Sequence, residues 1–166
     1  MICIWSVLIA SGEAVMIGRR VFLALCLVGL PVATSGARAQ SASAPLRLVL
    51  KGYDPVAYFT DGKPTPGKSE YEGIFDGARY HFASAQHLEL FRADPDRYAP
   101  QYAGSCAAAI ATGRKLEAQP ENWLIVGGKL FVFAGRGGVD KMVAHPAELI
   151  AKGQENWKTL ADAPYQ

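Results

Sequence analysis

The chain has 166 residues, with 17 Lys or Arg against 15 Asp or Glu, for a formal net charge of +2. No basic cluster is present, so the charge gives no support to nucleic-acid binding. Once an N-terminal export signal is set aside, the remaining length suits one domain with a modest hydrophobic core.

The first 39 residues have the pattern of a secretory signal peptide. Arg19-Arg20 precedes the apolar run 21–28, and Ala37-Arg38-Ala39 fits an A-x-A cleavage site. The paired arginines are typical of a twin-arginine signal, although the export route stays open. The segment before Met16 adds nothing that a signal needs, so Met16 is an alternative start to Met1. We therefore expect a periplasmic or secreted protein that meets the membrane only through its signal before cleavage.

After the signal, residues 40–50 are expected to form a flexible leader, residues 51–160 the folded domain and residues 161–166 a tail. Asp54-Pro55 predicts a helix start, because Asp accepts bonds from free N–H groups and Pro suits the first helical position. The apolar residues 56–59 then predict a short helix.

A first β-hairpin is predicted where Asp76-Gly77 separates residues 71–75 from residues 78–82. Asp-Gly readily takes the positive φ angles of a tight two-residue turn. Ser84 is expected to cap a helix over residues 85–93. Asp94-Pro95 then predicts one more helical turn.

Ser105 is expected to cap a helix over residues 106–111, and a second hairpin is predicted around Gly127-Gly128. Its strands are residues 123–126 and 129–133. The glycine-rich residues 135–138 lack the spacing and the lysine of a phosphate-binding loop, so they predict a turn.

Short helices are predicted over residues 139–144 and 147–151, and no internal repeat is strong enough to trust. Two hairpins with short helices between them predict an α+β domain, in which the hairpins build one small sheet with the helices packed around it.

Three sequence blocks, in matching order and spacing, resemble one known family. The first is residues 51–59, KGYDPVAYF; the second is Tyr80-His81-Phe82-Ala83-Ser84; the third is residues 91–102 followed by Gly104-Ser105-Cys106-Ala107. The chain resembles the exported stand-alone YHS-domain (seleno)protein family from about Gly52 to Leu160.

The resemblance implies an exported protein of no established activity, with relatives in metal-handling proteins such as heavy-metal transport ATPases. Some stand-alone members carry selenocysteine, and the resemblance places it at Cys106, which suits a reactive or metal-binding site. The metal-handling relatives are cysteine-rich. This chain has a single cysteine in the region of resemblance, so a closed structural metal site is not supported.

Cys106 is expected to be the only thiol of the mature chain, since Cys3 and Cys26 lie in the signal. A single cysteine cannot form an internal disulfide, so it is buried, metal-bound, paired with another chain or reactive. A helix N-terminus would favour the thiolate, which is a nucleophile and a soft metal ligand. The neighbouring alanines, residues 107–109, favour a buried inert side chain instead. Both interpretations stay open.

His81 and His87 are candidate ligands that would join Cys106 in holding a copper or zinc ion. The alternative packs His81 in the sheet and leaves His87 on a solvated helix face. Tyrosines can line a ligand pocket or form core walls. Three are weak candidates for a pocket: Tyr53, Tyr80 and Tyr102.

Two functional hypotheses follow. The first is a non-enzymatic module that binds a metal ion or small ligand, centred on Cys106 with help from His81. The second is a thiol redox enzyme that uses Cys106 and an external resolving thiol, because the chain has no C-x-x-C pair. No Ser–His–acid or paired-carboxylate pattern is evident.

Overall fold

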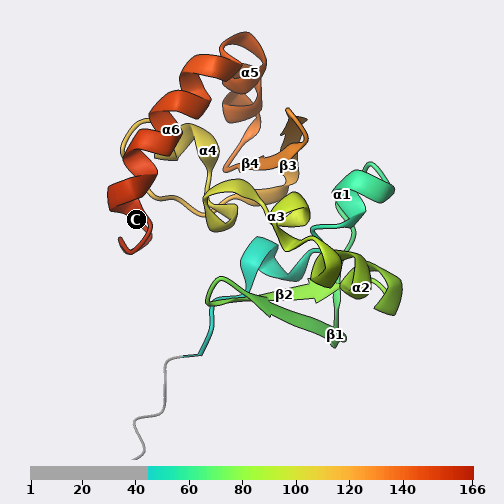
Figure 1. Cartoon of the computed structure of the whole chain (residues 1–166). Coiled ribbons are helices and arrows are strands. Elements are labelled where there is room, and N and C mark those ends of the chain that lie inside the picture. The colour runs from blue at the N-terminus through green and yellow to red at the C-terminus, as the bar shows by residue number, and fades with distance from the viewer. Residues whose placement is uncertain (1–44) are drawn as a thin grey trace, which may run out of the picture. The chain divides into compact units, whose positions relative to one another are not determined.

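The computed structural model describes residues 45–166 (Figure 1). The expected signal peptide, its cleavage site and the alternative start at Met16 lie outside these residues. None of the helices within residues 45–166 is long and apolar enough to span a membrane.

The described residues alternate short helices with two hairpins. In chain order the elements are η1 (Val49–Gly52), α1 (Ala57–Thr60), β1 (Lys68–Phe75), β2 (Ala78–Phe82), α2 (Ala85–Ala93), α3 (Pro95–Tyr98), η2 (Gln101–Gly104), α4 (Ala107–Ile110), β3 (Gln119–Val126), β4 (Lys129–Phe133), α5 (Arg136–Ala144) and α6 (Pro146–Leu160).

The α+β class is confirmed, but the two hairpins do not share a sheet. β1 pairs with β2 and β3 pairs with β4, which makes two separate antiparallel sheets. Each hairpin packs against the helix that follows it, α2 on the first and α5 on the second. The strands of different hairpins are therefore not paired edge to edge, and the single expected sheet is wrong.

Both predicted turns are confirmed. Asp76 and Gly77 have φ angles of 46° and 66°, and Gly127 and Gly128 have 57° and 73°. Positive φ at both central residues matches the right-handed twist of the paired strands. The hairpins therefore begin from local turn chemistry, as the sequence predicted.

The structure shows an internal repeat that the sequence did not reveal. In each copy a 3₁₀ turn with three positive φ angles leads into a four-residue helix, then a hairpin, a nine-residue helix and a helix that begins with proline. The three angles are 53°, 53° and 85° at Leu50–Gly52, and 55°, 48° and 74° at Tyr102–Gly104. Each hairpin also carries a register irregularity near its start. We call the units that begin at Leu50 and at Tyr102 the first and second copies.

Equivalent positions of the two copies keep their burial, but most of them change their residue type. This is why the repeat is hard to recognise in the sequence. The buried pairs are Tyr80 and Phe131, Phe82 and Phe133, Leu88 and Val139, Phe91 and Met142, and Tyr98 and Leu149.

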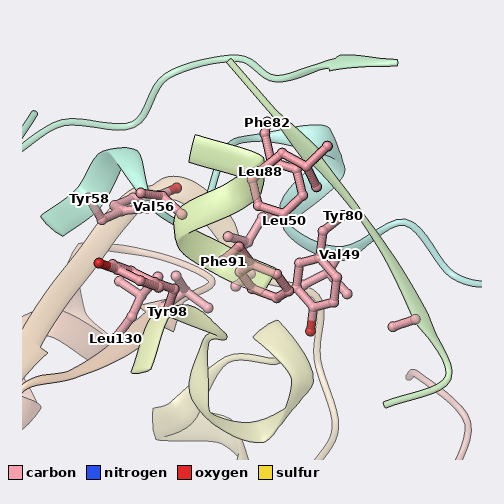
Figure 2. Packing of buried hydrophobic residues seen from close by; sticks show 13 residues of the cluster. Val49, Leu50, Val56, Tyr58, Tyr80, Phe82, Leu88, Phe91, Tyr98 and Leu130 are labelled. Atoms are coloured by element: carbon pink, nitrogen blue, oxygen red, sulfur yellow. The ribbon is translucent and has the colours of Figure 1, made fainter. Parts of the chain in front are cut away.

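Two hydrophobic clusters form the core, and strand β4 contributes to both. Leu130 and Val132 point into the cluster of the first copy (Figure 2 shows this cluster and labels Leu130), while Phe131 and Phe133 belong to that of the second. Successive side chains of a strand point to opposite faces, so β4 fills both cores at once. Strand β4 is therefore shared by the cores of the two copies.

Three local expectations in the second copy are corrected. The glycine-rich turn expected over residues 135–138 is the start of α5, which begins at Arg136. The short helix expected over residues 147–151 is part of the 15-residue α6, which continues through Gly153. Glycine is a poor helix former, but here it lets Tyr102 approach the helix. Ser105 does not cap α4, because its hydroxyl bonds the Tyr165 hydroxyl at 2.8 Å.

Both ends of the described chain pack against the domain. Val49 and Leu50, within the expected leader, are buried. In the expected tail, the Ala161 and Ala163 carbonyls accept bonds from Lys115 Nζ at 2.6 and 2.9 Å.

Candidate functional site

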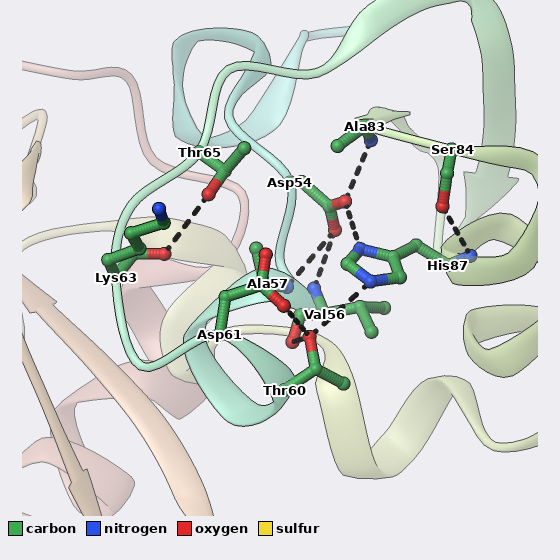
Figure 3. A network of polar contacts seen from close by, with 10 residues as sticks. All are labelled: Asp54, Val56, Ala57, Thr60, Asp61, Lys63, Thr65, Ala83, Ser84 and His87. Atoms are coloured by element: carbon green, nitrogen blue, oxygen red, sulfur yellow. Dashed lines mark hydrogen bonds and ion pairs between the residues drawn. The ribbon is translucent and has the colours of Figure 1, made fainter.

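Asp54 is fully buried and binds four donors in the first copy (Figure 3). Its Oδ1 accepts from the N–H groups of Val56 at 2.8 Å and Ala57 at 3.3 Å. Its Oδ2 accepts from the Ala83 N–H at 2.7 Å and contacts His87 Nδ1 at 2.6 Å. An ionised carboxylate only accepts, so His87 donates through Nδ1. The carboxylate is thus fully satisfied without water.

The His87 imidazole fills the space between this carboxylate and α1. Its Nε2 lies 3.4 Å from Thr60 Oγ1, which in turn bonds Asp61 Oδ1 at 2.7 Å. Thr60 Oγ1 also lies 3.3 Å from the Val56 carbonyl, a common back-bond for helical threonine. The network ties α1 to α2, which is a structural role. His87 is not on a solvated face, as its side chain is 14% exposed.

His81 points from β2 toward the neighbouring strand. Its Nε2 lies 3.3 Å from Glu72 Oε2, and the side chain is 16% exposed. Glu72 and His81 are register partners on β1 and β2. His81 is therefore packed in the sheet, but it contacts a carboxylate and not the backbone.

Cys106 lies at the N-cap of α4 in the second copy and is a free thiol, 4% exposed. Its N–H donates to the Leu116 carbonyl at 2.9 Å, and its carbonyl accepts from Ala109 and Ile110 at 3.0 Å. These bonds fix the backbone and leave the Sγ facing the second-copy core and the cavity described below.

The three predicted metal ligands do not come together. Within residues 45–166 no group of three or more His, Cys, Asp or Glu side chains is placed to hold a metal ion. The physical reason is that His81 and His87 belong to the first copy, whereas Cys106 belongs to the second. The expected convergence of the two histidines with the thiol is therefore corrected.

The candidate tyrosines are core walls with one polar end. Burial, and then the nearby Asp76 carboxylate, raise the pKa of Tyr80 to about 12. Burial also raises the pKa of Tyr102, whose hydroxyl donates to the Ile150 carbonyl at 3.3 Å. Tyr80 and Tyr102 border one cavity of 290 Å³, while the Tyr53 hydroxyl reaches Glu121 at 3.4 Å. Cys106 does not line that cavity.

A different cavity, of 260 Å³, lies beside Cys106, and we call it the thiol cavity. Three of its wall residues are counterparts of residues in the Asp54–His87 network. Asp54 and Cys106 each follow the glycine of their 3₁₀ turn by two residues, Ala83 and Ala134 each follow the second strand of their hairpin, and His87 and Gly138 are each the third residue of their nine-residue helix. Gly138 has no side chain, and a Cβ there would lie 2.9 Å from the Phe133 ring and 3.3 Å from the Ala108 Cβ, so Gly138 lets α5 pack closely against these residues. The charged residues of its wall are Arg114 and Lys141.

Comparison with known proteins gives one match. Residues 56–102 match the family model of the YHS domain. The chain contains a YHS domain. The matched segment lies in the first copy up to Tyr102, the first residue of the second copy, and Cys106 lies beyond it. No curated protein and no solved structure matches the chain.

Proposed function

We propose that this YHS-domain protein is an exported, non-enzymatic module that binds a small ligand in the thiol cavity. The observation that carries the proposal is the difference between the two copies. In the first copy a buried carboxylate and imidazole fill the site, whereas in the second the thiol borders a cavity of 260 Å³.

A small ligand fits the thiol cavity better than a metal ion does. Zinc and copper sites in proteins take several Cys, His or carboxylate ligands. Cys106 is the one side chain of these types in the cavity wall. A copper or zinc ion bound there would need its remaining ligands from another molecule.

The thiol redox enzyme remains the second candidate, because Cys106 borders a cavity that opens to solvent through exposed residues such as Ala134. Such an enzyme would need an external thiol to resolve the oxidised cysteine. Hydrogen peroxide reduction by an added thiol is a direct test. We expect no Cys106-dependent turnover, and sustained turnover would replace the binding module with the enzyme.

Alkylation tests the binding proposal. We expect iodoacetamide to modify Cys106 in the folded protein at neutral pH, and Cys106→Ser to take up no label. The matched control is Leu88→Ala, which weakens the first-copy core. Labelling through the cavity would keep its rate in this variant. A rate that rises with the loss of stability would mean that Cys106 reacts only after unfolding, and the proposal would fail.

A further inference from the structure

The loops that follow the short helices α1 and α4 are equivalent in the two copies. The Asp54 N–H donates to the Thr65 carbonyl, and the Cys106 N–H donates to the Leu116 carbonyl, each at 2.9 Å. We call residues 113–117 the cavity loop, because part of it lines the thiol cavity. The position of this loop therefore sets one wall of that cavity.

The two loops differ in what holds them. In the first copy Pro64 and Pro66 flank Thr65, and a proline ring fixes its own φ angle and leaves the chain fewer open conformations. The cavity loop has Lys115 and Glu117 at the equivalent positions and contains no proline. Contacts with another segment must hold it instead.

Residues 161–166, which we call the strap, supply these contacts. Lys115 is only 7% exposed, and its Nζ donates to the Ala161 carbonyl at 2.6 Å and the Ala163 carbonyl at 2.9 Å. Within residues 45–166 no other acceptor bonds this ammonium group. A buried charge without hydrogen-bond partners is costly, so Lys115 cannot stay buried when the strap leaves.

Tyr165 fastens the strap through both its ring and its hydroxyl group. The Arg47 guanidinium lies 4.6 Å from the ring centroid, and the Lys115 ammonium lies 5.0 Å from it. The hydroxyl lies 2.8 Å from the Oγ of Ser105, which is fully buried. Because Ser105 precedes Cys106 in the chain, the strap contacts the backbone that carries the thiol.

Gln166 joins the strap to the cavity loop directly. Its N–H donates to the Lys115 carbonyl at 3.0 Å, and its amide oxygen accepts from Arg114 Nε at 3.3 Å. Arg114 lines the thiol cavity. The strap thus holds the backbone and two side chains of the cavity loop.

We propose that the strap regulates access to the thiol cavity. While the strap is docked, it holds the cavity loop against Cys106. When the strap is released, Lys115 turns to solvent, the loop opens and Cys106 becomes more accessible. This inference rests on the proposed function and concerns the regulation of the same site.

Tyr165→Ala weakens the strap and tests the proposal. We expect iodoacetamide to modify Cys106 at least about fivefold faster than in the parent, because two cation–π contacts and a hydroxyl bond are lost. The matched control is Tyr71→Ala, which removes a first-copy tyrosine whose ring centroid lies 5.7 Å from Lys68 Nζ. Its rate should stay within about twofold of the parent. Equal acceleration in both variants, or none in Tyr165→Ala, would overturn the proposal.

Amide hydrogen exchange, followed by NMR, shows whether the cavity loop itself opens. The Cys106 N–H, which bonds the Leu116 carbonyl, should exchange faster in Tyr165→Ala than in the parent. The Asp54 N–H is the internal control, because prolines hold its loop and its rate should not change. Equal acceleration of both amides would mean that the whole protein unfolds, and faster exchange without faster alkylation would mean that the strap does not control access. Either result would overturn the proposal.

Lys115→Met removes the ammonium group and keeps the apolar stem, so it should reproduce both effects of Tyr165→Ala. Together the variants separate this inference from the proposed function. Alkylation of the parent at a rate that neither variant changes would reject the strap and leave the small-ligand module standing. A parent that is not alkylated, with two variants that are, would support the strap and reject the open cavity. A Cys106 that stays unmodified in all three folded proteins would reject both.

Discussion

Asp54 shows how much one buried residue organises the first copy. Its carboxylate joins the turn before α1, the end of β2 and the helix α2 through four short contacts. A buried charge is tolerated only when its partners are in place, and the loss of one partner leaves the others unsatisfied.

We expect Asp54→Asn to lower the free energy of unfolding by about 2–4 kcal/mol, because an amide NH₂ group would face N–H donors or His87. Urea unfolding measures the loss. Asp61→Asn makes the same change at an exposed position nearby and should alter stability by less than about 0.5 kcal/mol. Equal effects of the two variants would contradict the role given to Asp54.

Buried tyrosines predict a loss of stability at alkaline pH. The pKa of Tyr80 is raised to about 12, and burial also raises the pKa of Tyr58. A raised pKa in the folded state means that the unfolded chain loses its phenol proton first. The stability that these groups contribute is complete below about pH 10, which is the pKa of tyrosine in the unfolded chain. It falls as the pH rises toward about 12. Urea unfolding across this window should show the decline, and Tyr80→Phe should reduce it. If the free energy of unfolding declined equally in Tyr80→Phe, the alkaline loss of stability would come from other groups.

At the scale of elements, packing requires the glycine at position 153 of α6 but not the glycine at position 137 of α5. A side chain at Gly153 would collide with the Tyr102 hydroxyl, whereas a Cβ at Gly137 would meet nothing within 4 Å. Both glycines lie inside helices, where alanine is otherwise favoured by up to about 1 kcal/mol.

We therefore expect Gly153→Ala to destabilise the protein by about 1–3 kcal/mol and Gly137→Ala to be neutral or stabilising. Thermal unfolding of the two variants gives the comparison. If Gly153→Ala stabilised the protein, Tyr102 would be able to move aside without a loss of stability.

At the scale of the whole molecule, the shared strand β4 makes the two copies depend on one another. Leu130 and Val132 are fully buried in the first-copy cluster although they belong to the second hairpin. A first copy without β4 would leave that apolar surface uncovered.

We expect a fragment of residues 45–104, which includes the matched YHS segment, to show no cooperative unfolding transition. The protein of residues 45–166 should unfold in a single step. Circular dichroism during urea titration distinguishes the two. A folded fragment would show that the first copy is a domain by itself.

The export hypothesis also belongs to the whole molecule. The N-terminal pattern predicts cleavage after Ala39, so N-terminal sequencing of the exported protein should begin at Gln40. An intact N-terminus in the membrane fraction would contradict it.

Local chemistry was enough to predict much of the fold. The Asp76-Gly77 and Gly127-Gly128 turns, the Ser84 cap and the Asp94-Pro95 helix start depend on residues within a few positions of one another. Such preferences act on the backbone directly and are readable in the sequence. They predicted the hairpins and most helices, while the cysteine count marked Cys106 as the thiol to examine.

The tertiary structure decided the rest, because it depends on contacts between distant residues. The Asp54–His87 pair joins residues 33 positions apart, and the separation of the sheets follows from which helix covers each hairpin. In the repeat, equivalent side chains keep their burial although most of them differ in type. Gly138 stands where the first copy has His87 and lies close to Phe133 and Ala108, and that difference between the copies is a property of the fold.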